Sequence, residues 1–483
     1  MLLAKKKKSQ SEKMMFYLGL PLALIIFAII FTLPTPAGLT YSGKVSLAVF
    51  VFALILWVSE ALPTYVTALL VIALLSIFGG WDEKSVLGVF GYNVIWLMVA
   101  AFVITSGMEK SGFARRLALW MVTKFGKTSK TILLSLLVVN FLIAFIVPST
   151  TARAAMMLPI VLLIGEAYGV HDGNRNLGKL LGIQGLQANN ISTSAILTAT
   201  APQILAVGLI RDMTNYEVSW SQWFIASAPI AVLTLAASYF IGLKLFKPEM
   251  ALPKGEGIDQ IQEEYKKLGK MSTTEKKALF IFALTILLWA TDKWHIPMFG
   301  FQISLVMVAI ISAILFFLPY IGILDWKETK IPWNLMIFSA GAYAAGISLN
   351  STGVASWALK GIFDGLGVEK MSFITLYAVV IFISSFSHFV FTSKTVRTII
   401  IIPTVIALAN AVGINPVALA LPAAFTIADT ITLPPHCKPN LIYYSTGNYT
   451  VMDQLVYGVL VLLAKWVLMF VASFTWFKLL GIV

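Results

Sequence analysis

The segment Ser149-Thr150-Thr151-Ala152-Arg153 recurs 244 positions later as Ser393-Lys394-Thr395-Val396-Arg397. A proline follows at the same distance in both copies, at Pro159 and Pro403. Each segment is a short polar interruption of an otherwise apolar stretch. A register that matches serine, threonine, arginine and proline together indicates that the chain contains two repeats. In membrane transporters, broken polar elements at matching places of two repeats mark a substrate site near the middle of the bilayer.

The composition places the whole chain in a membrane. Of its 483 residues, 59% are hydrophobic and 12% are charged, which excludes the soluble globular classes. A helix needs roughly 20 apolar residues to cross the hydrocarbon. The apolar runs predict an all-α polytopic protein with about eleven transmembrane helices and two re-entrant hairpins. One cysteine and four scattered histidines leave no disulfide framework and no clustered metal ligands, so we expect neither a cofactor nor metal chemistry.

The net charge of +13 could indicate nucleic-acid binding, but the basic residues lie in short loops. The run Lys5 to Lys8 precedes the first apolar segment. The positive-inside rule explains this distribution better than a nucleic-acid partner. We therefore expect a multi-pass protein of the cell membrane, with a cytoplasmic N-terminus and a first helix that is not cleaved.

Gly, Pro and charged segments divide the chain into two halves. The predicted boundaries are an N-terminal segment and first helix at 1–43, a first repeat at 44–246, a charged linker at 247–276 and a second repeat at 277–483. The first repeat divides into a scaffold part at 44–125, a hairpin at 131–170 and a broken helix at 178–212. The second divides into a scaffold part at 277–361, a hairpin at 372–411, a broken helix at 416–447 and a final helix at 453–480. Five crossings per repeat is an odd number, which predicts that the repeats are inverted. Gly107 and Gly112 predict a break in the long segment 86–123.

The hairpin tips are the first candidates for substrate binding. The start of each second arm offers free backbone N–H groups and the positive end of a helix dipole, which favour an anion. The alternative is that the hydroxyl groups only bond their own backbone. The candidate side chains are those of Ser149, Thr150, Thr151, Ser393 and Thr395.

Lys394 is the most informative single residue. A buried ammonium at the bilayer centre costs between about 3 and over 10 kcal/mol, so something must compensate it. We expect a substrate carboxylate, or a fixed charge at the place where a related protein binds a cation. A structural pair with an acid such as Asp429 is the alternative.

Arg153 and Arg397 lie in the first turn of each second arm, where a cation opposes the helix dipole. A planar guanidinium suits bidentate binding of a substrate carboxylate. The alternative is that each arginine fastens its hairpin to a neighbouring helix.

Two proline-containing breaks are the remaining candidates for the wall of the site. Broken helices expose carbonyl and amide groups at depth. A plain kink is the alternative. The residues concerned are Thr200, Ala201 and Pro202 in the first break, and Pro434, Pro435 and His436 in the second.

The paired Ser-X-Thr tips, the proline-bearing breaks and the two halves together resemble the divalent anion/sodium symporter family over nearly the whole chain. Where that family carries an asparagine in each tip that helps to bind sodium, this sequence has Thr150 and Lys394. The first tip is more similar to the exchanger branch, which includes 2-oxoglutarate/malate translocators and bacterial citrate and tartrate antiporters. The resemblance implies a homodimer that works as an elevator, with a scaffold domain and a mobile transport domain.

These observations lead to one expected function and its alternatives. We expect a sodium-independent antiporter that exchanges C4 and C5 dicarboxylates such as succinate, malate, fumarate and 2-oxoglutarate, with the sodium sites lost at Thr150 and Lys394. The main alternative is sodium- or proton-coupled symport of the same substrates. A passive anion channel is a further alternative. An enzyme is not expected, because no nucleophile and base have a suitable spacing.

Overall fold

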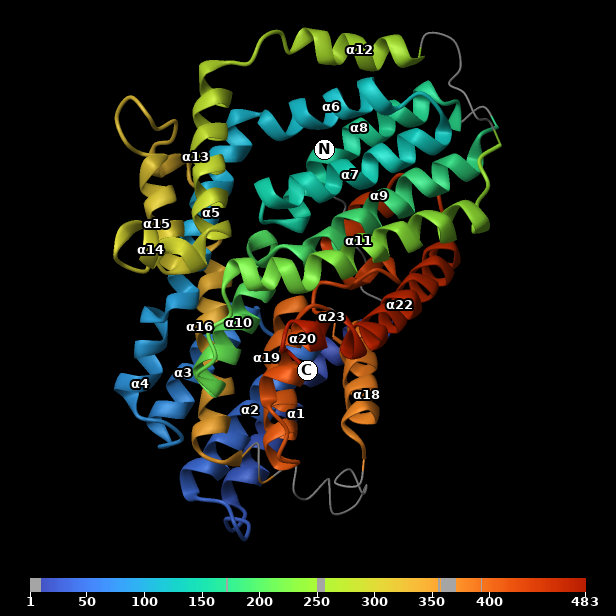
Figure 1. The fold of residues 1–483 in the computed structure, drawn as a ribbon. Helices are drawn as coiled ribbons and strands as arrows, with labels where there is room; N and C mark the ends of the chain where they lie inside the picture. The colour runs from blue at the N-terminus through green and yellow to red at the C-terminus, as the bar shows by residue number, and fades with distance from the viewer. Residues whose placement is uncertain (1–9, 171–172, 250–256, 355–356, 358–370, 392) are drawn as a thin grey trace.

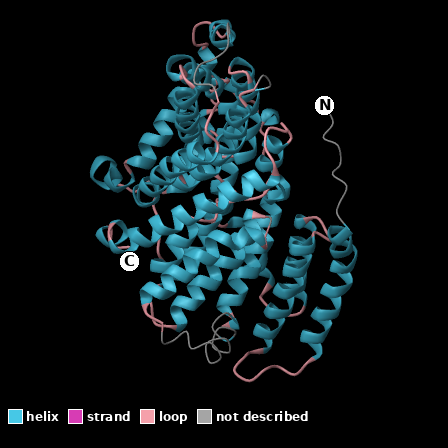
Figure 2. Cartoon of the chain, turned by 90° about the vertical axis from the view of Figure 1, so that its right-hand side faces the viewer, coloured by secondary structure: helices cyan, strands magenta, loops and turns pink. Residues whose placement is uncertain are grey.

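The computed structural model describes residues 10–170, 173–249, 257–354, 357, 371–391 and 393–483. Within these residues the secondary structure is helical, and no strand is present (Figure 2). The Lys5 to Lys8 run and part of the predicted scaffold segment 277–361 lie outside the described residues. The prediction of an all-α fold is confirmed.

The first half of the chain forms helices α1 to α11 (Figure 1). Their bounds are α1 Gln10–Thr32, α2 Tyr41–Ser59, α3 Thr64–Ile77, α4 Glu83–Gly88, α5 Asn93–Ser111, α6 Phe113–Phe125, α7 Ser129–Ile146, α8 Thr150–Ala167, α9 Arg175–Ala195, α10 Ala201–Thr214 and α11 Trp220–Leu245.

The second half forms the remaining helices (Figure 1). Their bounds are α12 Gly257–Lys267, α13 Thr273–Ala290, α14 His295–Phe299, α15 Leu305–Leu315, α16 Trp333–Ser351, α18 Phe373–Phe386, α19 Lys394–Ala411, α20 Pro416–Ala424, α21 Lys438–Tyr444, α22 Val451–Phe474 and α23 Trp476–Leu479.

Seven helical segments of the described chain are long and apolar enough to cross a membrane. Counting α13 and its continuation, which bends by 67°, as one span gives an eighth. Four shorter apolar helices accompany them, among them Thr64–Ile77 and Leu305–Leu315. A multi-pass membrane protein is therefore confirmed.

The long segment 86–123 is broken at Gly112, one of the two glycines that predict a break, whereas Gly107 lies inside α5. Helix α5 ends at Gly112, whose φ of 73° is left-handed, and α6 starts at the next residue. Because glycine has no Cβ, it adopts this conformation without steric cost. The chain can therefore change direction between α5 and α6.

The second arms of the two hairpins are built alike. Helices α8 and α19 both have 18 residues, and each begins directly after the repeated serine. The hydroxyl of Ser149 accepts a hydrogen bond from the backbone N–H of Ala152 at 3.3 Å, and that of Ser393 accepts one from Val396 at 3.3 Å. The two serines are helix N-caps, which satisfy amides that no carbonyl of the helix can reach. The repetition seen in the sequence is thus present in the local structure of the tips.

Two polar contacts join α6 to α13, and α9 to the segment that follows α11. Arg116 on α6 forms an ion pair with Glu275 at the start of α13, at 2.6 Å. The backbone N–H of Asn176 on α9 donates to the carboxylate of Glu249 at 3.0 Å. Helices α6 and α12 are seen together at the top of Figure 1.

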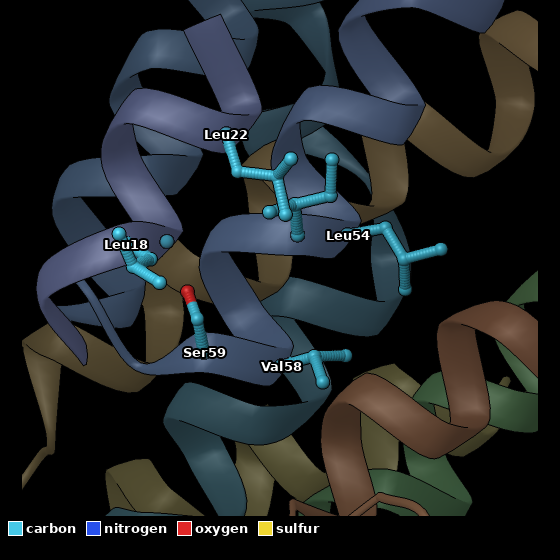
Figure 3. A pocket seen from close by; sticks show the side chains of 7 residues that line it. Leu18, Leu22, Leu54, Val58 and Ser59 are labelled. Carbon is cyan, nitrogen blue, oxygen red and sulfur yellow. The ribbon is translucent and has the colours of Figure 1, made fainter. Parts of the chain in front are cut away.

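An apolar cavity of about 410 Å³ lies between α1 and α2 (Figure 3). Because its lining lacks charged side chains and offers one hydroxyl, that of Ser59, it is not suited to bind a small anion. The lining residues are Leu18, Gly19, Leu22, Leu54, Ile55, Val58 and Ser59.

Candidate functional site

The two hairpin tips converge on neighbouring residues of α9. Arg153, at the first tip, donates from Nε to the side-chain oxygen of Asn189 at 2.9 Å. Lys394, at the second tip, donates from Nζ to the side-chain oxygen of Asn190 at 2.9 Å. Asn189 and Asn190 are both completely buried. Two segments that are far apart in the sequence are therefore brought to one place by consecutive residues of a single helix.

The first tip is fastened firmly to α9. The amide group of Asn189 donates to the carbonyl oxygen of Thr150 at 2.8 Å. Arg153 also donates from Nη2 to the hydroxyl of Thr193. The structural alternative for Arg153 is therefore seen. Its Nη1 is buried and has no hydrogen-bond partner among the described residues, so part of the guanidinium stays available.

Arg397 binds the backbone of the second break. Its Nη1 donates to the carbonyl oxygen of Asp429 at 3.2 Å. Its Nη2 donates to the carbonyl of Thr426 at 3.0 Å and to that of Ile427. These carbonyls follow α20, where the helix ends and no further turn can satisfy them. The guanidinium therefore fixes the shape of the break, and these contacts are those of a structural residue.

Lys394 is linked to the second break through two asparagines. The side-chain amide of Asn190, which accepts from Lys394, is itself 3.4 Å from the side-chain oxygen of Asn440. Asn440 donates to the carbonyls of Thr430 at 2.8 Å and Leu433 at 2.7 Å. Tip, helix and break therefore form one continuous polar network.

The acid that the sequence offered as a partner for Lys394 is engaged elsewhere. Asp429 pairs with Lys465 of α22 at 2.7 Å, and both side chains are at least 98% buried. Lys465 also donates to the carbonyl of Phe425 at 3.0 Å. The alternative of a structural pair between Lys394 and Asp429 is thus not seen, because a second buried lysine binds the carboxylate.

Among the described residues, Lys394 bonds to an amide and not to a carboxylate. Within the described part of the chain, its bonding partner is the neutral amide of Asn190. The side chain is only partly buried, so a ligand can reach it. A cation in this position is suited to bind an anion from solution.

A pair of histidines lies beside the second tip. The centres of the imidazole rings of His388 and His436 lie 5.0 Å apart. The hydroxyl of Thr432 lies between them, 2.8 Å from Nε2 of His388 and 3.2 Å from Nδ1 of His436. His388 therefore belongs to the polar cluster around the second break.

The two breaks occur where the prolines predict them. Between α9 and α10 the chain is not α-helical from Ile196 to Thr200, and Gln203 bridges the gap by donating to the carbonyl of Thr193 at 2.9 Å. The second break separates α20 from α21. Thr200, Ala201, Pro202, Pro434 and His436 are buried at these breaks, whereas Pro435 is exposed.

The polar character of α9 is visible in the sequence. The stretch Gln184 to Ser194 is rich in amide and hydroxyl side chains, although its neighbours in the chain are apolar, and all its residues are buried. A helix that is polar and fully buried in a membrane protein must bond to other polar groups. This property would have pointed to Asn189 and Asn190 as the place where the tips meet.

Comparison with known proteins agrees with this architecture. Residues 15–483 match the family described as the sodium:sulfate symporter transmembrane region. The chain is 27% identical over 477 residues to the sodium-dependent dicarboxylate transporter SdcS of Staphylococcus saprophyticus, covering 95% of this chain and 91% of that protein. It is also 27% identical over 492 residues to a membrane protein of Cupriavidus necator, covering 98% and 94%.

Two solved transporter structures share the fold. The YdaH transporter of Alcanivorax borkumensis superposes with a TM-score of 0.53 at 12% identity, covering 95% of this chain and 97% of that one. MtrF of Neisseria gonorrhoeae, described as an antimetabolite efflux pump, gives a TM-score of 0.56 at 15% identity, covering 97% and 96%. At such low identity these matches concern the fold alone.

Proposed function

Because the chain belongs to the sodium:sulfate symporter family, a family of secondary transporters, we propose that it carries C4 and C5 dicarboxylates across the cell membrane together with sodium. The observation that supports an anionic substrate is the meeting of Arg153 and Lys394 on adjacent residues of α9. Cations contributed by two separate tips suit a substrate with two carboxylates. The name of the SdcS relatives supports the dicarboxylate class.

Sodium coupling is favoured by the comparisons over the antiport expected from the sequence. The relatives named SdcS are sodium-dependent. Unwound segments of broken helices commonly coordinate sodium in transporters. The second break contains oxygen atoms that suit this role. The side-chain oxygens of Gln187 and Thr430 are buried there without a hydrogen-bond donor among the described residues. The amide group of Gln187 donates to the carbonyl of Ile431, which places it at the same break.

Exchange without sodium is the second candidate, and Lys394 favours it. Its ammonium carries a fixed charge at one of the tip positions where the sequence resemblance implies a sodium ligand. A charge that cannot leave with the substrate would hinder the return of an empty carrier, because an unneutralised cation is costly in hydrocarbon. A mixed case is compatible with this fixed charge: Lys394 replaces one sodium ion and a second sodium site remains.

The test is uptake of labelled succinate into proteoliposomes. Uptake into vesicles without internal dicarboxylate, driven by a sodium gradient and lost when sodium is replaced by choline at equal ionic strength, is the expected result. Uptake that requires internal dicarboxylate and ignores sodium would favour the antiporter. Current through a planar bilayer without any counter-substrate would indicate the passive anion channel.

We place substrate contacts on the hairpin tips and on the two breaks, with Thr150, Thr151 and Thr395 next to the charged residues. We also propose inverted repeats, a homodimer, a scaffold formed by 44–125 and 277–361, a moving part formed by the hairpins and broken helices, and a cytoplasmic N-terminus. Cross-linking of the purified protein in lipid nanodiscs tests the dimer.

A further inference from the structure

The two histidines beside the second tip form a chain of hydrogen bonds with a defined direction. Nδ1 of His388 lies 2.8 Å from the carbonyl oxygen of Ser385. A carbonyl can only accept, so Nδ1 of His388 carries a proton. His388 is fully buried and forms no ion pair with an acid in the described part of the chain, which disfavours a charged ring. Its Nε2 is therefore unprotonated and acts as an acceptor.

The proton position on His388 also determines which nitrogen of His436 carries a proton. Since Nε2 of His388 is an acceptor, the hydroxyl of Thr432, 2.8 Å away, donates its only proton to it. The oxygen of Thr432 must then accept from its other neighbour, Nδ1 of His436, at 3.2 Å. A neutral His436 with its proton on Nδ1 has a free electron pair on Nε2. The chain of bonds thus presents one hydrogen-bond acceptor at its end.

His436 belongs to the second break, where the proposed function places substrate contacts. His436 retains 5% of its surface exposed, and Nε2 has no hydrogen-bond partner among the described residues. The next residue, Cys437, donates to the side-chain oxygen of Asn440 at 3.0 Å, and Asn440 is linked to Lys394 through Asn190. A carboxylate has no proton to offer to such an acceptor, whereas a hydroxyl group has one.

We infer that His436 recognises a hydroxyl group on the substrate, so that hydroxylated dicarboxylates bind more tightly than unsubstituted ones of the same length. This inference rests on the proposed function. Malate differs from succinate by one hydroxyl group and is the matched ligand pair. His388 and Thr432 act as positioning residues, because they hold the His436 proton on Nδ1.

The experiment is isothermal titration calorimetry of the purified full chain with malate and with succinate in sodium buffer. The wild-type protein should bind malate about two- to tenfold more tightly, the range that a hydrogen bond between uncharged groups supplies. His436→Phe should remove this preference, whereas His436→Gln, whose amide oxygen can still accept, should keep most of it.

A second pair of variants tests the direction of the hydrogen bonds. Thr432→Val should reduce the preference for malate, because valine cannot accept a hydrogen bond and so no longer holds the His436 proton on Nδ1. Thr432→Ser, which keeps the hydroxyl, should preserve the preference. His295→Gln, at a histidine that lies against Phe299 on α14, is the control for a general effect of losing an imidazole.

The outcomes separate the inference from the proposed function. Equal affinities in the wild-type protein, or an unchanged affinity ratio in both His436→Phe and Thr432→Val, would overturn the role of His436 while dicarboxylate binding stands. Absence of binding by both ligands in the wild-type protein would overturn the proposed function, and the inference with it. If His436→Phe does not fold, Thr432→Val against Thr432→Ser decides.

Discussion

Lys465 of α22 binds the carboxylate of Asp429 at 2.7 Å, so this acid is not free to pair with Lys394. Lys465 bonds in addition to the carbonyl of Phe425, so one ammonium joins α22 to both the end of α20 and the break that follows. Arg397 also binds the backbone of this break. Two structural cations thus shape the break, and a third, Lys394, remains for the ligand.

Removal of Lys465 should destabilise the protein strongly. In Lys465→Met the carboxylate of Asp429 stays buried without its partner, which costs about 3–5 kcal/mol in comparable pairs. The double variant Lys465→Met, Asp429→Asn should recover much of this loss, since no charge is left unpaired. Thermal unfolding in detergent measures both.

The exposed pair of Lys330 with Glu109, at 3.0 Å, is the control. Its lysine side chain is 76% exposed, and such pairs contribute only about 0–1 kcal/mol. Lys330→Met should therefore leave the unfolding temperature nearly unchanged. Equal effects of the two substitutions would show that the Asp429 pair is not important for stability.

Lys394→Asn should change the dependence of transport on sodium. The substitution removes a fixed charge from the tip and restores the residue that the resemblance places there. We expect uptake to need a higher sodium concentration and to rise more steeply with it, because an additional ion must supply the missing charge. Initial rates of succinate uptake over a range of sodium concentrations measure this.

Lys438→Asn provides the matched control for that measurement. Lys438 starts α21, close to the same break in the chain, but its side chain is exposed. A purely long-range effect of one positive charge would appear in both variants. An unchanged sodium dependence in Lys394→Asn would remove Lys394 from the site.

Gly458→Ala should disturb the second break through packing alone. A Cβ at position 458 would lie 2.6 Å from the carbonyl oxygen of Ile431 and 2.8 Å from Cα of Thr432. These are backbone atoms, so the break or α22 must move. We expect a loss of about 1–3 kcal/mol in stability and weaker substrate binding, measured by thermal unfolding and calorimetry.

Gly346→Ala is the control for this substitution. The nearest atoms to its added Cβ are 3.6 Å away, an ordinary contact distance. Stability should hardly change. Wild-type affinity in Gly458→Ala would indicate that the second break is not part of the site.

Much of the fold follows from local rules that the sequence exhibits directly. The serine caps of α8 and α19, the break at Gly112 and the two proline breaks each depend on one or two residues and on the covalent geometry around them. The number of spans is less well specified, because helices such as Leu305–Leu315 are shorter than the about 20 residues that a full crossing needs.

The pairing of side chains in the site could be predicted only in part. Lys394 and the arginines attract notice because a charge in an apolar sequence is costly. Lys465 satisfies the same criterion but lies alone in a long apolar helix, away from any repeated segment. That it binds Asp429, and that His388 meets His436, depends on tertiary contacts between segments that no local pattern connects.

Asn190→Asp should weaken substrate binding without unfolding the protein. The new carboxylate has nearly the shape of the amide and would lie where the side-chain oxygen now accepts from Lys394 at 2.9 Å. Charges about 4 Å apart attract by about 4 kcal/mol at an effective dielectric constant of about 20. The new carboxylate would therefore neutralise the ammonium of Lys394 and weaken its attraction for an anionic ligand. We expect at least a tenfold loss of succinate affinity by calorimetry. Asn189→Asp, which faces Arg153 instead, is the comparison variant. It should reduce the affinity less, because Arg153 is already bonded to Asn189 and Thr193. Equal affinities in the wild type and Asn190→Asp would exclude direct binding of the substrate by Lys394.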